Sequence, residues 1–116
     1  MLDVAVGFQS HHKQHRDALA GAIAQLGGAP VQPKSMADYA TALNAGTLKS
    51  QADVLDLAAR LEMGAANAYL GVIPAFGDPT FSQIAGRIAA DETMHWTVLA
   101  QALGRPLPTD ALSFGA

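Results

Sequence analysis

A carboxylate and an imidazole three residues apart, Glu92 and His95, lie where a helix should present apolar side chains. The large apolar residues around them recur with the period of a helix that has one buried face: Phe81, Ile84, Ile88, Leu99 and Leu103. Burying such polar groups without partners costs roughly 2–7 kcal/mol each, so a partner must compensate. A bound metal ion is the leading candidate for that partner.

Two other helical segments also carry ligand-type residues on their apolar faces. His12 and His15 are spaced i, i+3 on the first segment, with His11 just off the same face, and Glu62 interrupts the second. Side chains at this spacing lie about 5–6 Å apart, close enough to reach one ion or two adjacent ions. Oxygen and imidazole ligands without sulfur suit a transition metal, with iron as the first candidate and manganese or zinc as the others. The candidate metal ligands are His12, His15, Glu62, Glu92 and His95.

The same residues also allow a metal-free interpretation. A lone histidine on an apolar face is usually a core histidine with a hydrogen-bond partner, and a single Glu-x-x-His is common by chance. In this alternative, Glu62 and Glu92 are hydrogen-bonded to His15 and His95, and metal plays no part.

Helical periodicity and turn signals predict three long helices, at about 3–26, 48–73 and 79–103. Gly27-Gly28 and Pro30 end the first, Pro74 and Gly77 end the second, and Asp78-Pro79 caps the third. The connection over 29–46 is a crossover, in which Ser35 to Asp38 can cap a short helix through Leu43. We expect the tail to pack as irregular structure, with Leu107, Leu112 and Phe114 covering apolar surface. Strand signals are nearly absent, so the predicted class is all-α.

Helices of this length more often pack in fours than in threes. The short turn between the second and third helices makes them an antiparallel pair, whereas the longer crossover lets the chain cross the bundle. A fourth helix is then either missing from the N-terminus, where the first helix starts without a strong cap, or supplied by a second chain. We therefore expect a homodimer that completes the bundle.

The composition of the chain argues against nucleic-acid binding, cysteine-based metal sites and membrane insertion. The 116 residues suffice for one domain over 1–116, and half of them are hydrophobic while 15% are charged. A net charge of −3 without a Lys/Arg cluster disfavours nucleic acid as a partner, and the absence of cysteine excludes thiolate metal sites. No apolar run approaches the roughly 20 residues that span a bilayer, so membrane insertion is not expected. Nothing in the sequence specifies a small-molecule substrate.

The pattern resembles the ferritin-like domain. Leu61-Glu62 followed by Ala65-Ala66 and Tyr69, then Asp78-Pro79 and Asp91-Glu92-Thr-Met-His95, are similar to that family, as is the run from His12 to Leu19 with Leu26-Gly27-Gly28. The resemblance covers nearly the whole chain and is nearest to bacterial ferritin-like proteins of uncharacterised function, many of them exported by the twin-arginine route. It leaves the compartment open between bacterial cytoplasm and periplasm. It implies a four-helix bundle with one long crossover.

The resemblance also implies a di-metal site built from two single glutamates and two Glu-x-x-His motifs. Glu62 matches one single glutamate, Glu92 with His95 matches one complete motif, and His15 matches the histidine of the other. His12 stands where that motif has its glutamate, and the second single glutamate belongs to a first helix that these residues do not include. Glu62 and Glu92 supply two negative charges, so two divalent ions would leave an excess of about +2 in a dry core. One ion fits the charges better, and the expected role is iron binding, oxidation, or chemistry on dioxygen or peroxide.

Overall fold

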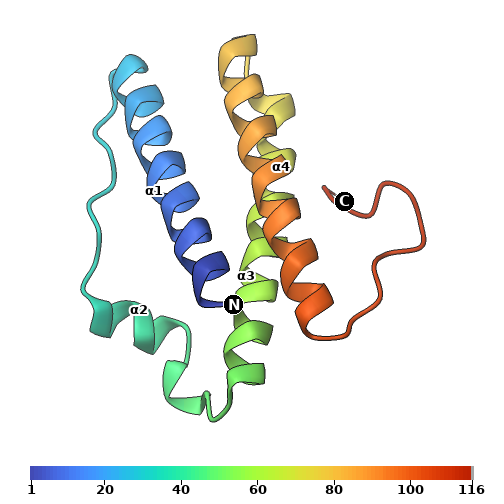
Figure 1. Ribbon diagram of the computed structural model, residues 1–116. Coiled ribbons are helices and arrows are strands. Elements are labelled where there is room, and N and C mark those ends of the chain that lie inside the picture. The colour runs from blue at the N-terminus through green and yellow to red at the C-terminus, as the bar shows by residue number, and fades with distance from the viewer. Residues whose placement is uncertain (116) are drawn as a thin grey trace.

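The computed structural model describes residues 1–115, and these residues form helices, turns and loops without a strand. Three long helices dominate: α1 (Leu2–Gln25), α3 (Gln51–Val72) and α4 (Pro79–Ala102). The short helix α2 (Met36–Ala42) lies in the crossover, and two single 3₁₀ turns cover Ala45–Thr47 and Ile73–Ala75 (Figure 1). The all-α class predicted from the sequence is confirmed.

Capping residues set where the helices begin. The Ser50 hydroxyl accepts from the Asp53 amide, and the Asp53 carboxylate accepts from the Ser50 amide, which makes a capping box. For this reason α3 begins at Gln51 rather than near residue 48. Ser35 and Asp38 form the same arrangement ahead of α2. The Asp78 carboxylate accepts from the Thr80 amide ahead of α4, whose first residue is Pro79.

The two C-terminal long helices, α3 and α4, form a tightly packed antiparallel pair. Small residues on both facing surfaces let the backbones approach closely, and all of them are at most 4% exposed: Ala59, Ala66, Ala85, Ala89 and Ala100. Trp96 and Leu99 complete the core at the end of the pair near the C-terminus of α4. This rigid pair fixes the position of every polar side chain that the two helices turn inward.

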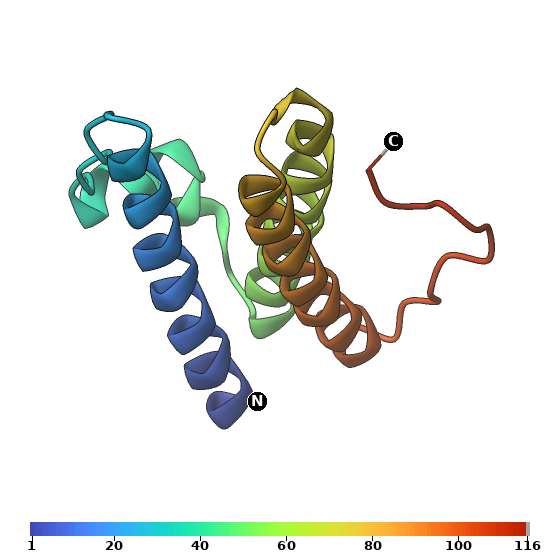
Figure 2. The same ribbon diagram turned by 90° about the horizontal axis from the view of Figure 1, so that it is seen from above.

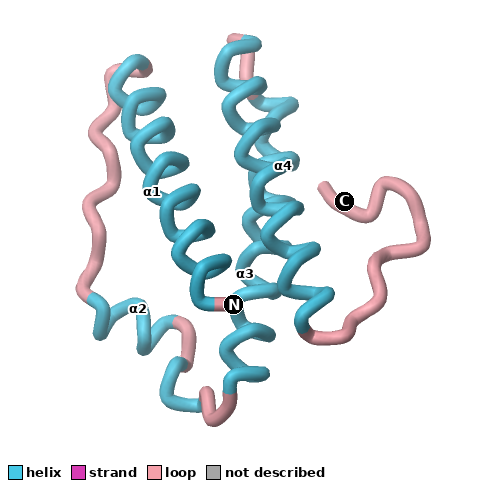
Figure 3. The backbone as a smooth tube through the Cα atoms, in the orientation of Figure 1, coloured by secondary structure: helices cyan, strands magenta, loops and turns pink. Residues whose placement is uncertain are grey.

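The first helix leans on α4 and stands apart from α3. No Cα atom of α1 lies within 8 Å of a Cα atom of α3, although α1 packs against α4. Figure 2 shows the resulting separation between α1 and the α3/α4 pair. The crossover leaves the bundle as loop and short helix (Figure 3), with Val31 89% and Met36 82% exposed. Three helices therefore leave one side of the bundle open, between α1 and α3.

The tail after α4 covers less apolar surface than expected. Phe114 packs edge-on against Trp96 with 5.2 Å between ring centroids, and the Gly115 amide donates to Asn67 Oδ1 at 2.8 Å. Leu107 and Leu112 remain 52% and 93% exposed, so these two side chains cover little of the apolar surface that they were expected to cover. Leu112 has a φ of 60°, in the left-handed region that residues other than glycine seldom adopt.

None of the helices described over 1–115 is long and apolar enough to cross a membrane.

Candidate metal centre

Three acidic and imidazole side chains are buried between α3 and α4. Glu62 of α3 is 7% exposed, Glu92 of α4 is 3% exposed, and His95, one turn after Glu92, is fully buried. His95 Nδ1 lies 3.3 Å from Glu62 Oε2 and 3.3 Å from Glu92 Oε2. Two carboxylates and an imidazole therefore converge in the dry layer that the apolar stripes of α3 and α4 create.

One face of α1 completes the site, because residues at i, i+3, i+4 and i+7 share a helix face. His12 Nε2 lies 3.2 Å from Glu62 Oε1, and His12 Nδ1 lies 3.8 Å from Glu92 Oε1. Phe8, one turn earlier, stacks on the His95 ring with 3.9 Å between centroids. The side chains of α1 thus bridge to α3 even though the two backbones remain apart.

Four of the five candidate ligands come together around one point. One ligand atom each from His12, Glu62, Glu92 and His95 lies within 4.8 Å of the others. Four ligands at roughly 2.0–2.2 Å from a tetrahedral ion stand roughly 3.3–3.6 Å apart, so the separations would have to shorten by at most about 1.5 Å to seat one ion. Glu92 Oε2 is also buried without a hydrogen-bond partner among the described residues, because its contact with His95 lacks hydrogen-bond geometry. An unpartnered buried carboxylate oxygen is where a cation fits.

The fifth candidate, His15, lies behind Glu92 rather than among the four. Its Nδ1 is 3.1 Å from Glu92 Oε1 and its Nε2 is 2.9 Å from Asp91 Oδ2. Both ring nitrogens thus face carboxylate oxygens, and the ring holds Glu92 in place from the side of α1. The sequence predicts His15 as a ligand; its ring nitrogens contact Glu92 and Asp91, and His15 lies outside the group of four.

Two residues outside the predicted set also belong to the site. His11 Nδ1 lies 2.8 Å from His95 Nε2, and Asp91 makes the contact with His15 described above. The signal that finds them is a repeated five-residue pattern: His11-His12-Lys-Gln-His15 on α1 and Asp91-Glu92-Thr-Met-His95 on α4. Sequence reasoning placed His11 just off the ligand face, because it could not show that this flank of α1 faces α4.

Burial and mutual repulsion make the carboxylates hard to ionise together. Burial first, and then the neighbouring carboxylate of Glu92, raise the pKa of Glu62 from 4.5 to about 9. Burial also lowers the pKa of His95 below its usual 6.5, against the opposing pull of Glu92. A cation at the centre would replace the proton on Glu62 and relieve this repulsion, so the donor set fits a metal ion.

We expect the stability of the chelator-treated protein to fall between pH 7 and pH 9. In this window the folded state keeps a proton on Glu62 that the unfolded state has already lost, so raising the pH favours unfolding. His95, with its lowered pKa, acts in the opposite sense only near and below 6.5. The slope is limited to one proton, which is at most about tenfold in the unfolding equilibrium constant per pH unit. Melting curves across this range measure it.

The matched control for this pH effect is Glu62→Gln, which keeps the shape of the side chain and removes the titration. The slope between pH 7 and pH 9 should flatten in that variant. A melting temperature that is constant or rises with pH in the chelated wild type would contradict the assignment.

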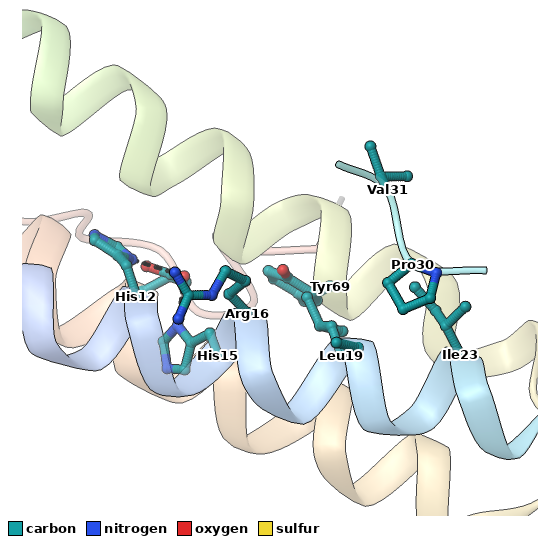
Figure 4. A pocket seen from close by; sticks show the side chains of 10 residues that line it. His12, His15, Arg16, Leu19, Ile23, Pro30, Val31 and Tyr69 are labelled. Atoms are coloured by element: carbon teal, nitrogen blue, oxygen red, sulfur yellow. Dashed lines mark hydrogen bonds and ion pairs between the residues drawn. The ribbon is translucent and has the colours of Figure 1, made fainter. Parts of the chain in front are cut away.

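Two cavities reach the site from the open side of the bundle. One, of about 390 Å³, contains His12, His15 and Glu92 at its inner end and Tyr69, Leu19 and Ile23 along its walls. Figure 4 shows these walls leading from Pro30 and Val31 of the crossover toward the two histidines. The other, of about 540 Å³, reaches His12 and Glu62 between the N-terminal parts of α1 and α3. Between them, the two cavities reach His12, Glu62 and Glu92 along the space between α1 and α3.

One of three comparisons with known proteins identifies a family for this chain. The sequence profile of the family described as "Ferritin-like domain" matches residues 1–105, which cover all four helices and every residue of the site. Searches of curated proteins and of solved structures gave no significant match.

Proposed function

The chain belongs to the ferritin-like domain family, and from this premise we propose that it binds one transition-metal ion through His12, Glu62, Glu92 and His95. The observation that carries the proposal is that one ligand atom from each of these four residues lies within 4.8 Å of the others, and that one of the two Glu92 oxygens is buried without a hydrogen-bond partner among residues 1–115. Iron is the first candidate, with manganese or zinc as the others, because the ligands are oxygens and imidazoles. A bound iron would supply redox chemistry with dioxygen or peroxide at a coordination position left open by the protein.

Charge supports one ion rather than two. Glu62 and Glu92 together neutralise one divalent cation, and Asp91 is already held by His15. A second cation would lack a counter-charge, since α1 carries His12 where α4 carries Glu92. The protein's own groups then act by holding the ion, excluding bulk water from its buried side and leaving an approach between α1 and α3.

The proposal predicts about one metal ion per chain in gently purified protein. Elemental analysis measures this stoichiometry directly, and titration of Fe(II) into stripped protein under anaerobic conditions measures the affinity. A preparation that carries no transition metal, and that neither binds added Fe(II) nor gains stability from it, would rule the proposal out.

A metal-free structural or interaction module is the alternative function. The direct contacts from His12 to Glu62 and from His15 to Glu92 favour it, because they satisfy buried polar groups without an ion. In this alternative the bundle retains the ligand residues only as a hydrogen-bonded network. The response of the melting temperature to a chelator separates the two functions.

We also propose that two copies of the chain associate through the part of the open side near the N-terminal ends of α1 and α3, which leaves the cavity beside Tyr69 as the approach to the metal. Apolar side chains remain exposed along the space between α1 and α3, where Leu2 is 78% and Val54 51% exposed. Burying this strip against a second copy would complete the helical core. Sizing chromatography combined with light scattering should give a dimer mass, whereas a monomer at high concentration would mean that the three helices suffice alone.

A further inference from the structure

The His95 ring is held on every side by α1 and by the carboxylates. Phe8 stacks on its face, and His11 lies nearly coplanar with it, at an interplanar angle of 9°. The 2.8 Å distance from His11 Nδ1 to His95 Nε2 is that of a hydrogen bond between two imidazoles. His95 is fully buried, so water does not replace this contact.

The contact has a counterpart on the other side of the site. In each of the two five-residue patterns, the first residue contacts the last residue of the other pattern: His11 meets His95, and Asp91 meets His15. In both cases the contacted nitrogen is Nε2, and Nδ1 faces the carboxylates of the centre. The two histidines are therefore held in the same way. The Nε2 atom of His95 contacts the His11 imidazole of α1, whereas the Nε2 atom of His15 contacts the Asp91 carboxylate of α4.

The direction of the hydrogen bond between His11 and His95 depends on whether His95 Nδ1 carries a proton or binds a metal ion. Nδ1 faces Glu62 Oε2 and Glu92 Oε2. When the proton of Glu62 stands on Oε1, beside His12 Nε2, both of these oxygens can only accept. Nδ1 then carries the proton of His95, which leaves Nε2 as an acceptor for His11 Nδ1–H. A metal ion needs the lone pair of Nδ1, so the proton of a metal-bound His95 stands on Nε2 and is donated to His11 Nδ1. His11 is able to serve both states because each imidazole nitrogen can donate or accept.

We propose that His11 is the positioning residue for His95 and that the hydrogen bond between them reverses direction when a metal ion binds. The inference rests on the proposed metal-binding function and adds a residue that touches no metal. In the metal-bound state His11 accepts and carries its own proton on Nε2; in the metal-free state it donates from Nδ1. No net charge is gained or lost in this exchange, since each ring keeps one proton.

Substitutions at His11 test whether metal binding requires a group that accepts a hydrogen bond from His95 Nε2–H. His11→Ala removes the partner, and we expect its Co(II) affinity to fall about 10- to 100-fold, the usual loss when the group that orients a ligand histidine is removed. His11→Asn places an amide oxygen at the same branch position as Nδ1, so affinity should return to near the wild-type value. His11→Asp only accepts, which favours the metal-ready form of His95, and its affinity should equal or exceed that of the wild type. Lys13→Ala, an exposed change on the same helix, is the matched control.

Nitrogen NMR of the wild-type protein reads the reversal directly. Diamagnetic Zn(II) is the probe, and the spectra of ¹⁵N-labelled histidine before and after its addition show which nitrogen of His11 bears the proton. We expect the proton on Nδ1 without zinc and on Nε2 with it, a change that a merely structural contact would not produce. This measurement needs no variant, so it stands even where a substitution fails to fold.

The two levels of the proposal fail separately. If neither Zn(II) nor Co(II) binds the wild type, the proposed function is wrong. If both bind tightly, but His11→Ala binds Co(II) as well as Lys13→Ala does and the His11 proton stays on Nδ1, the role assigned to His11 is wrong and the metal-binding function remains.

Discussion

Replacing Glu92 with alanine is expected to abolish stoichiometric metal binding. The Glu92 carboxylate stands between all the groups that converge on the centre, with Oε1 at 3.1 Å from His15 Nδ1 and Oε2 at 3.3 Å from His95 Nδ1. Its removal takes away a ligand and half of the negative charge, and it frees His15 from the position it now holds. We expect the affinity for Fe(II) or Co(II) to fall by more than about 100-fold, beyond the usual loss for an orienting residue. Metal content after dialysis and competition with a chelator of known affinity measure it.

Three further variants make this result specific. His95→Ala should lose metal to a similar extent, since it removes the fully buried ligand. Glu92→Gln keeps the size of the side chain and lowers the charge, so a loss there shows that the carboxylate itself is required. Asp3→Asn removes an exposed acid of α1 and should bind as the wild type does. Retention of about one ion per chain in Glu92→Ala would contradict the assigned ligand set.

Most of the helices could be predicted from local signals in the sequence. Asp78-Pro79 fixes the start of α4 because the aspartate caps the first amides and proline suits the first helical position. The start of α3 was predicted near residue 48, three residues too early, because periodicity alone does not locate the cap. The cap is Ser50, whose hydroxyl and amide pair with Asp53 three residues later.

The sequence predicted the residues of the candidate site only where a polar residue occupies a position of a helix face that is otherwise apolar. Glu62, Glu92 and His95 interrupt apolar stripes, and all three are buried together. The sequence could not predict which contact each histidine of α1 makes, because the contacts depend on which neighbouring helix α1 packs against. Since α1 packs on α4 and stands away from α3, His11 reaches His95, His12 reaches Glu62 and His15 falls behind Glu92. Helix spacing alone gives the face but not the direction of the neighbouring helix.

The distribution of charge explains how this site differs from a symmetric di-metal arrangement. The two five-residue patterns place side chains at matching positions, yet α4 supplies Asp91 and Glu92 where α1 supplies His11 and His12. All the negative charge of the pair of patterns therefore comes from α4, and Glu62 of α3 adds the rest. An imidazole can orient or ligate a cation but does not neutralise it. The side-chain positions therefore match those of a two-metal site, whereas the negative charge is enough to neutralise only one divalent ion.

Removing metal is expected to lower the melting temperature by more than ten degrees if the protein is a metal binder. An ion present at about 1,000 times its dissociation constant stabilises the native state by roughly 4 kcal/mol. For a domain of this size each kcal/mol moves the melting temperature by roughly 4 °C, so chelation should lower it by about 15 °C. The physical reason is that the ion binds only the folded state, where it replaces the proton that the buried Glu62 otherwise keeps. Calorimetry of the metal-loaded protein with and without chelator measures the difference.

The Glu92→Ala protein serves as the internal control for this shift, because chelator should leave its melting temperature unchanged. Restoring Fe(II), Mn(II) or Zn(II) one at a time to stripped wild type should restore the melting temperature, and the size of each recovery ranks the three ions. The melting temperature of the wild type could instead be the same with chelator, with each added ion and with neither. That result would support the metal-free alternative. In that case the contacts from His12 to Glu62 and from His15 to Glu92 satisfy the buried groups on their own, and Glu92→Ala should then destabilise the fold by leaving His15 Nδ1 without its partner in the core.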